Sequence, residues 1–253
     1  MTEISTARRA HHYLYGERRP LSVDGPFADY FAERTAVISI DMHEGHLSTA
    51  ADCPCPAPRG REIIAPINDF HRSVRDLNIP VIHVLSALRV SGADDLGGRA
   101  PSAWRVTFPM YVGEISGAAQ HALQGSRWTT PATEVDPRDE LVTGKKRLSA
   151  FYPTDLDFLL RQMGVSTIIL DGIMTDCCVL NTAFDGSNRG YRVIVAGDLC
   201  RGTDQHLEEA ALAMMSLHMA LVVDSADLLA VLGETLAPAQ QPGPTARRGY
   251  PRV

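Results

Sequence analysis

Short runs of valine, isoleucine and leucine recur along the chain, and their spacing constrains the fold more than any other feature. Six such segments are predicted to be strands: Thr35–Asp41, Pro80–Leu85, Glu140–Thr143, Thr167–Asp171, Arg192–Ala196 and Ala220–Asp224. Several are apolar almost throughout, which is typical of strands buried on both faces of a parallel sheet. Helical patterns accompany them, at Arg61–Leu77, Asp155–Met163, Asp176–Arg189, His206–His218 and Ser225–Leu232. The alternation predicts a three-layer α/β/α fold with a doubly wound, mostly parallel, six-stranded sheet.

A chain of 253 residues is long enough for one α/β domain with a large buried core. We predict that this domain covers residues 35–235, between an N-terminal arm, residues 1–34, and a flexible tail, residues 236–253, rich in Pro, Gly and Gln. The segment Arg89–Asp136 interrupts the alternation and contains both tryptophans. Because long irregular segments in compact domains are usually functional, we expect this one to cover a binding site.

Composition excludes several classes of protein. The formal net charge of -6 offers no basic surplus for nucleic acid. No apolar run approaches the roughly 18 residues that span a bilayer, and the first residues lack the apolar stretch of a signal peptide. Five unevenly spaced cysteines suit a reducing compartment better than a disulfide framework. These features predict a cytoplasmic protein that binds neither nucleic acid nor a membrane.

Three chemically reactive groups follow different predicted strands. Asp41 ends the first strand, Lys145 follows the third, and the turn Gly172–Cys178 follows the fourth. Ligands of parallel α/β sheets bind beyond the carboxyl ends of the strands. These residues, distant in sequence, can therefore meet in one crevice.

The two adjacent cysteines lie near the predicted start of a helix. Thr175 is a suitable N-cap, and Asp176 would occupy the first helical turn. The helix dipole and a nearby Lys145 ammonium would lower the pKa of Cys178 and make it nucleophilic. A small cysteine packed in the core is the alternative. For Cys177 we favour the core position, whereas for Cys178 the chemistry alone leaves both interpretations open.

Three ordered motifs resemble those of the isochorismatase-like superfamily. The run GIMTDCCVLNTAFD resembles its signature, Gly-x-x-Thr-x-x-Cys-Val followed by Thr-Ala and an Asp, with matches at Gly172, Thr175, Cys178, Val179, Thr182, Ala183 and Asp185. In the second block the family's lysine stands four residues before the serine of Ser-Ala-Phe, which selects Lys145 and not Lys146. The first block, an apolar strand ending in Asp, matches VISIDM and Asp41.

The resemblance implies a cysteine hydrolase that cleaves a small amide, carbamoyl or ureido C–N bond through a thioester and releases ammonia or an amine. Similar proteins act on carbamoyl amino acids, ureidoacrylate, biuret, maleamate or nicotinamide. The implied catalytic residues are Asp41, Lys145 and Cys178. The implied oxyanion hole uses the N–H groups of Met174 and Cys178, beside a cis peptide bond between Ile173 and Met174.

A run of polar residues after the first strand departs from the family pattern. Relatives often carry Gln where this chain has His43, and the run from His43 to His46 could be a metal site or a pocket wall. Nicotinamidases of the superfamily bind metal through an Asp-x-His pair and a later His. Asp52 is instead followed by Cys53 and Pro54. We therefore favour the pocket wall and expect no metal and no cofactor.

Cys53 and Cys55 are too close for a relaxed disulfide, lack evident zinc partners and are interpreted as loop residues. Candidate substrate-binding residues are His43, Trp104, Arg105 and Arg201. Arg201 could bind a substrate carboxylate or form a surface salt bridge.

Two other functions remain open from the sequence. One is a non-catalytic module that binds a small molecule or senses oxidation through its thiol. The other is vinyl-ether hydrolysis of the isochorismate type, although enzymes with that activity generally lack the cysteine. By analogy with relatives, the protein would be a homo-oligomer, a dimer or a tetramer.

Overall fold

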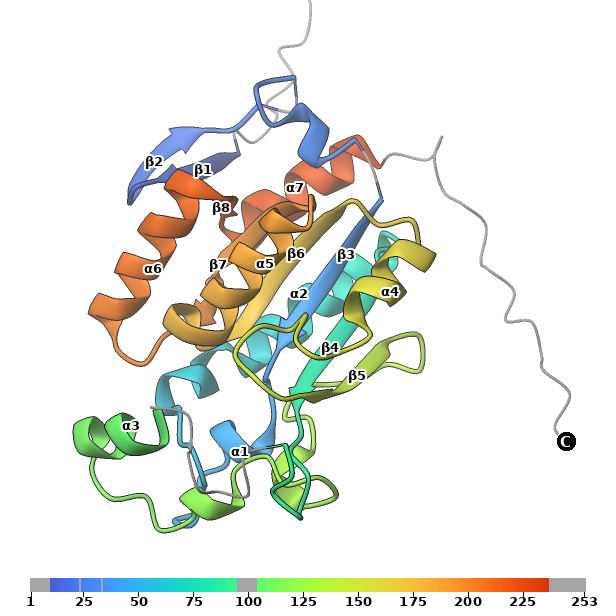
Figure 1. Cartoon of the computed structure of the whole chain (residues 1–253). Helices are drawn as coiled ribbons and strands as arrows, with labels where there is room; N and C mark the ends of the chain where they lie inside the picture. The colour runs from blue at the N-terminus through green and yellow to red at the C-terminus, as the bar shows by residue number, and fades with distance from the viewer. Residues whose placement is uncertain (1–9, 23, 33, 95–103, 237–253) are drawn as a thin grey trace, which may run out of the picture.

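A single twisted sheet organises the chain. The computed structural model describes residues 10–22, 24–32, 34–94 and 104–236. The strands run in the order β2-β1-β8-β7-β6-β3-β4-β5 (Figure 1). Their bounds are β1 His11–Leu14, β2 Glu17–Pro20, β3 Thr35–Ile40, β4 Val81–Ser86, β5 Glu140–Lys145, β6 Thr167–Ile173, β7 Arg192–Arg201 and β8 Ala220–Val223. Strands β3 to β8 are mutually parallel and correspond to the six strands predicted from the sequence.

The sheet has eight strands, so the predicted number of six is wrong. The two additional strands come from the predicted N-terminal arm. They form a hairpin, in which His11 faces Pro20, and β1 pairs antiparallel with β8. The Tyr13 hydroxyl donates to Asp224 at 2.8 Å and fixes the hairpin to the end of β8. Residues 1–9 and 237–253, which include most of the predicted tail, lie outside the described residues.

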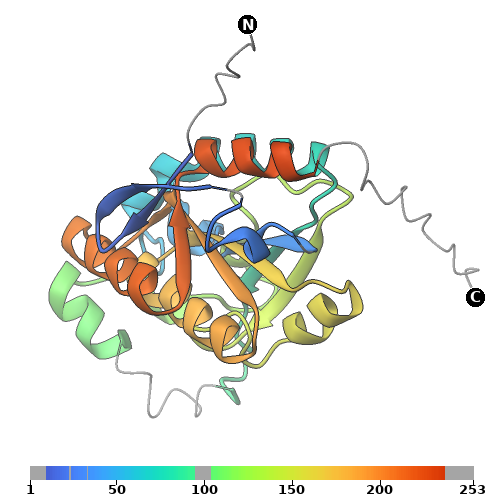
Figure 2. The same cartoon turned by 90° about the horizontal axis from the view of Figure 1, so that it is seen from above.

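Helices cover both faces of the sheet, as the alternation predicts (Figure 2). One layer contains α2 (Ile64–Asp76) and α7 (Ser225–Thr235); the other contains α4 (Leu156–Gln162), α5 (Leu180–Asn188) and α6 (Gln205–His218). Each layer packs on its own apolar cluster. The six residues of β3 are all buried, because the strand lies between these clusters at the centre of the sheet. In the described part of the chain, no helix has the length and apolarity needed to cross a bilayer.

Shorter elements lie beyond the carboxyl ends of the parallel strands (Figure 1). They are α1 (Glu44–Leu47), α3 (Trp104–Val112) and the 3-10 turns Pro58–Ile63, Ala118–Gln120 and Arg127–Thr129, whereas the turn Ala28–Tyr30 precedes β3 at the opposite edge of the sheet. The predicted cover, Arg89–Asp136, contributes α3 and two of these turns, and its residues 95–103 are not described. Backbone hydrogen bonds of 2.9 Å, from Glu44 to Thr130 and from Ala132 to Met42, attach it directly after β3. The segment therefore lies over the end of the central strand.

Gly172 allows β6 to approach β3 at the start of the turn Gly172–Cys178. Its φ is +109°, and a Cβ atom there would lie 2.3 Å from the carbonyl oxygen of Ile40. Residues with side chains rarely adopt this backbone conformation, and the neighbouring backbone cannot move without distorting the sheet.

Gly172→Ala is therefore expected to lower the free energy of unfolding by at least about 3 kcal/mol, because strain and a backbone clash add. Urea denaturation measures the change. Gly233→Ala is the control, since a Cβ at Gly233 in α7 would meet no atom within 4 Å. That variant should be unchanged or about 1 kcal/mol more stable. Equal stabilities of the two variants would contradict the close approach.

Candidate active site

Three side chains from three strand ends meet beyond the sheet. The Lys145 Nζ lies 2.5 Å from Asp41 Oδ2 and 3.3 Å from Cys178 Sγ. Asp41 follows β3, Lys145 ends β5, and Cys178 lies in the helical segment after β6. All three are buried, with at most 8% of each residue exposed. The structure thus brings together the acid, amine and thiol that the sequence places at separate strand ends.

Ser86 completes the polar cluster and was not predicted from the sequence. Its backbone N–H and its hydroxyl both donate to Asp41 Oδ1, at 3.0 and 2.8 Å. The Lys145 ammonium also donates to the Ser86 hydroxyl, at 3.1 Å. Both carboxylate oxygens are therefore engaged, one by Ser86 and the other by Lys145. A signal was present, since Ser86 follows the apolar run of β4 just as Asp41 follows that of β3.

Charge pairing decides the protonation of the buried acid and amine. Burial raises the pKa of Asp41, but the Lys145 ammonium, its hydrogen bond to the carboxylate and the nearby His43 and His46 together outweigh burial and hold this pKa well below its usual range. Burial likewise lowers the pKa of Lys145, but the charges and hydrogen bonds of Asp41 and Cys178 together raise it above its usual value. The resting site at neutral pH therefore contains a carboxylate and an ammonium.

The resting thiol does not follow the sequence-based expectation of a lowered pKa. Its contact with the Cys177 sulfur, at 4.0 Å, and its burial raise the pKa of Cys178 well above the ordinary value. The Lys145 ammonium opposes this rise but does not cancel it. Cys178 is therefore a protonated thiol at rest, and a nucleophilic thiolate requires a base.

The segment carrying Cys178 is wider than a normal helix. Thr175–Val179 forms a π-helical turn that continues directly into α5. The expected N-cap at Thr175 is wrong, because Met174 occupies the cap position and no side chain caps the segment. Wide turns of this kind occur often at functional sites, because they displace side chains from the regular helical positions.

Two features of the signature hold this segment. The peptide bond between Ile173 and Met174 is cis, at the position where the family resemblance places one. The Thr182 hydroxyl donates to the carbonyl of Cys178 at 2.7 Å and accepts from the N–H of Ala150 at 2.9 Å. Thr182 thus connects the cysteine segment to the Ser-Ala-Phe block that follows Lys145.

His43 lies against the acid, as a pocket-wall residue would. Its Nε2 is 3.9 Å from Asp41 Oδ1 and, although buried, has no hydrogen-bond partner, while its Nδ1 accepts from the Gly45 N–H at 3.1 Å. Burial, together with the neighbouring His46, lowers the pKa of His43 to about 3. The ring is therefore neutral at physiological pH and presents a buried polar atom beside the reactive groups.

The remaining substrate-binding candidates receive less support. The Arg201 guanidinium donates to the carbonyls of Asp198 and Cys200 and pairs with Glu62 at 3.4 Å. These contacts favour a structural role over carboxylate binding. Trp104 and Arg105 begin α3, and the structure describes only their backbone.

Three possible metal ligands also come together. His46, Cys55 and His121 are buried, and one donor atom from each lies within 4.8 Å of the other two. From the sequence, Cys55 is expected to be a loop residue without zinc partners, and no motif marks His121. Sequence periodicity carries no information on this juxtaposition, because the two histidines are 75 positions apart in irregular segments.

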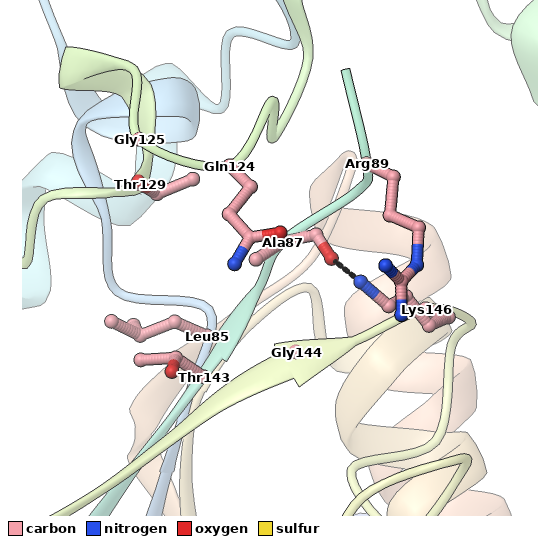
Figure 3. Close-up of a pocket in the computed structure, with 9 residues that line it drawn as sticks. All are labelled: Leu85, Ala87, Arg89, Gln124, Gly125, Thr129, Thr143, Gly144 and Lys146. Atoms are coloured by element: carbon pink, nitrogen blue, oxygen red, sulfur yellow. Dashed lines mark hydrogen bonds between the residues drawn. The ribbon is translucent and has the colours of Figure 1, made fainter. Parts of the chain in front are cut away.

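A cavity of about 470 Å³ is lined by residues that flank Ser86 and Lys145 in the sequence, but not by Asp41, Lys145 or Cys178. Figure 3 shows the lining residues. Lys146 lines the cavity, donating to the Ala87 carbonyl and pairing with Asp94 at 3.0 Å. Successive side chains of a strand point to opposite faces, so the neighbours of Ser86 and Lys145 face this cavity while those two residues face Asp41. Lys146 is therefore structurally distinct from Lys145.

The comparison with protein families settles the class of protein. A family model described as the isochorismatase domain matches residues 35–227. The chain therefore belongs to the isochorismatase family, and the resemblance seen in its motifs is confirmed.

Named relatives share parts of the chain. The ureidoacrylate amidohydrolase RutB of Methylobacterium radiotolerans is 40% identical over 95 residues, which is 37% of each chain. N-carbamoylsarcosine amidase of Arthrobacter is 27% identical over 171 residues, or 65% of this chain and 58% of the relative. A cysteine hydrolase from Pseudomonas syringae superimposes with a TM-score of 0.69 at 23% identity, covering 80% of this chain and 93% of that one. The alignments with the first two span less than two thirds of those proteins.

The two adjacent lysines allow a direct test of the geometry. Lys145→Ala would leave the Asp41 charge buried without its partner, and should cost about 3–5 kcal/mol of unfolding free energy. Lys146→Ala removes the ion pair with Asp94, which lies nearer the surface, and should lower the free energy of unfolding by no more than about 1 kcal/mol. Urea denaturation measures both, with Lys146→Ala as the matched control. A larger loss for Lys146→Ala would contradict the assignment of Lys145 to the ion pair.

Proposed function

We propose that this protein is a cysteine-dependent amidohydrolase that cleaves a small-molecule C–N bond in a linear amide, carbamoyl or ureido group. One observation carries the proposal: a single buried ammonium, that of Lys145, contacts both the Asp41 carboxylate and the Cys178 thiol. The first two named relatives, a ureidoacrylate amidohydrolase and an N-carbamoylsarcosine amidase, support the substrate class.

Acylation begins when Asp41 accepts the thiol proton. Cys178 Sγ then attacks the carbonyl carbon, and the N–H groups of Met174 and Cys178 stabilise the oxyanion. The negative charge moves from Asp41 to the sulfur, and the Lys145 ammonium contacts both groups, so it remains paired throughout. Collapse of the intermediate breaks the C–N bond. The leaving nitrogen takes the proton from Asp41 and departs as ammonia or an amine.

In deacylation Asp41 again accepts a proton, this time from water, and then returns it to Cys178. Water attacks the thioester carbonyl while Asp41 accepts one of its protons. The C–S bond then breaks, and Cys178 recovers a proton as the carboxylic acid product leaves. The site returns to a carboxylate, an ammonium and a thiol. These steps balance without a metal or an organic cofactor.

His43 is the proposed contact to the substrate. Its buried Nε2 has no hydrogen-bond partner in the structure, and a buried polar atom of this kind costs free energy unless a ligand satisfies it. A polar group of an amide or ureido substrate would form this missing hydrogen bond beside Asp41.

The small-molecule substrate is the only partner we propose from the site. Cytoplasmic location and homo-oligomerisation remain predictions.

Mutation of the two adjacent cysteines tests the nucleophile. Cys178→Ala should abolish turnover, because no thioester can form, whereas Cys177→Ala should retain most of it. Steady-state assays with a substrate identified by ammonia release measure both. Full activity of Cys178→Ala would disprove the mechanism, and the folded state of each variant is checked by circular dichroism.

Replacement of the acid tests general-base catalysis. Asp41→Asn keeps the size of the side chain but cannot accept the thiol proton, so kcat should fall by roughly 10²- to 10⁴-fold or more. KM should change less, because the amide retains much of the hydrogen bonding. A variant with unchanged kcat would assign the proton transfer to another group. Ser86→Ala should have a smaller effect, since its backbone N–H still donates to Asp41.

The substrate itself is best found by measuring ammonia release from a panel of small carbamoyl, ureido and amide compounds. Each active compound is tested again with Cys178→Ala. Release that persists in this variant would indicate a contaminant or a different site.

A further inference from the structure

Three buried donors converge beneath the cover of the active site. His46 lies in α1, Cys55 in the loop that follows it, and His121 directly after the turn Ala118–Gln120. Their exposed fractions are 5%, 3% and 8%, and one donor atom from each lies within 4.8 Å of the other two. The proposed hydrolysis uses none of them, so their proximity requires a separate explanation.

The donor set suits a zinc-type ion. Imidazole and thiolate are the preferred ligands of zinc, at Zn–N distances of about 2.0–2.1 Å and Zn–S distances of about 2.3 Å. In a tetrahedral site these lengths separate neighbouring donor atoms by about 3.4–3.6 Å. Donors within 4.8 Å of each other would therefore need to move inward by only about 1 Å. The set contains no carboxylate, and none of its members belongs to an Asp-x-His pair.

The ring of His46 is oriented for this role. His46 Nδ1 lies 2.8 Å from the carbonyl oxygen of Cys55, and a carbonyl can only accept, so Nδ1 carries the hydrogen. Nε2 then keeps the lone pair that binds a metal. Metal-binding histidines commonly donate their other N–H to a backbone carbonyl in this way. The carbonyl that accepts this hydrogen bond belongs to Cys55, itself a proposed ligand. His46 and Cys55 would therefore be connected twice, by the hydrogen bond and through the metal.

The neighbouring cysteine has a different environment. Cys53 Sγ contacts the carbonyl oxygens of Gly45 at 3.4 Å and Glu44 at 3.8 Å, so its thiol hydrogen is directed to the backbone. It is not among the three clustered donors. Of these two buried cysteines, only Cys55 therefore belongs to the cluster with the histidines.

We propose that His46, Cys55 and His121 bind one zinc-type divalent cation, with a water molecule as the fourth ligand. Binding releases the Cys55 thiol proton, because the metal coordinates the thiolate. The ion connects three segments that are not part of the sheet: α1, the loop 48–57 and the part of the cover that contains His121. Its role is to fix the cover over the strand ends, and the hydrolytic steps do not pass through it.

The experiment measures metal binding directly. Purified protein is stripped of metal and titrated with Zn²⁺ against a chromophoric chelator, and a second sample is titrated with Co²⁺. The wild-type chain should bind one equivalent, and the cobalt form should show sulfur-to-metal charge transfer in the near ultraviolet. Zinc at 100-fold excess over its Kd should raise Tm by about 5–10 °C relative to the stripped protein.

Matched variants locate the site. Cys55→Ser should lose the charge-transfer band and bind zinc at least about 10- to 100-fold more weakly, while Cys53→Ser should behave as wild type. His121→Asn is a second ligand variant, expected to weaken binding but to keep the band. Cys178→Ala should bind zinc normally, so failure of the metal site and failure of the proposed hydrolysis can be distinguished. Absence of metal binding by the wild-type chain, or wild-type affinity in both Cys55→Ser and His121→Asn, would overturn the proposal.

Discussion

The buried ion pair between Asp41 and Lys145 is the interaction on which the site depends. Removing two charges from water is costly, and the cost is met only where attraction is strong and the remaining hydrogen bonds are made. Ser86 makes those bonds to one carboxylate oxygen, and Lys145 contacts the other. The sheet supplies this geometry, because parallel neighbouring strands deliver residues distant in sequence to the same edge.

A resting pair of this strength has a chemical consequence. Asp41 is a weak base while it is paired, and Cys178 is a weak acid while it is buried. Proton transfer between them would be very unfavourable if it separated charge. In the proposed transfer it would not, because Lys145 lies within contact of both groups and the net charge of the three groups stays constant. In this proposal the main effect of the amine is to keep the site equally paired before and after transfer, and not to lower one pKa.

Most of the fold and the centre of the site follow from local sequence. The runs of Val, Ile and Leu mark the inner parallel strands, since burial on both faces demands them, whereas the edge strand β5, ELVTGK, is mostly exposed and only weakly marked. The strand ends identify Asp41 and Lys145. The β1–β2 hairpin was missed because its strands, HHYL and ERRP, are at most half-buried and lack that pattern. Its pairing is provided by the free edge of β8. Likewise the position of Ser86 after the apolar run of β4 is only a weak signal, because a lone serine forms no distinctive motif.

The π-helical turn at Thr175–Val179 contains one more residue per turn than the helix it leads into would require. Such a turn tolerates a change of length in a way that a regular helix does not. Loss of one residue would let the segment close into an ordinary helix, while the flanking strand and α5 kept their relative register. Only the side chains of the turn itself, Cys178 among them, would take up new positions. A change of one residue in this short segment could therefore alter the site while leaving the sheet intact.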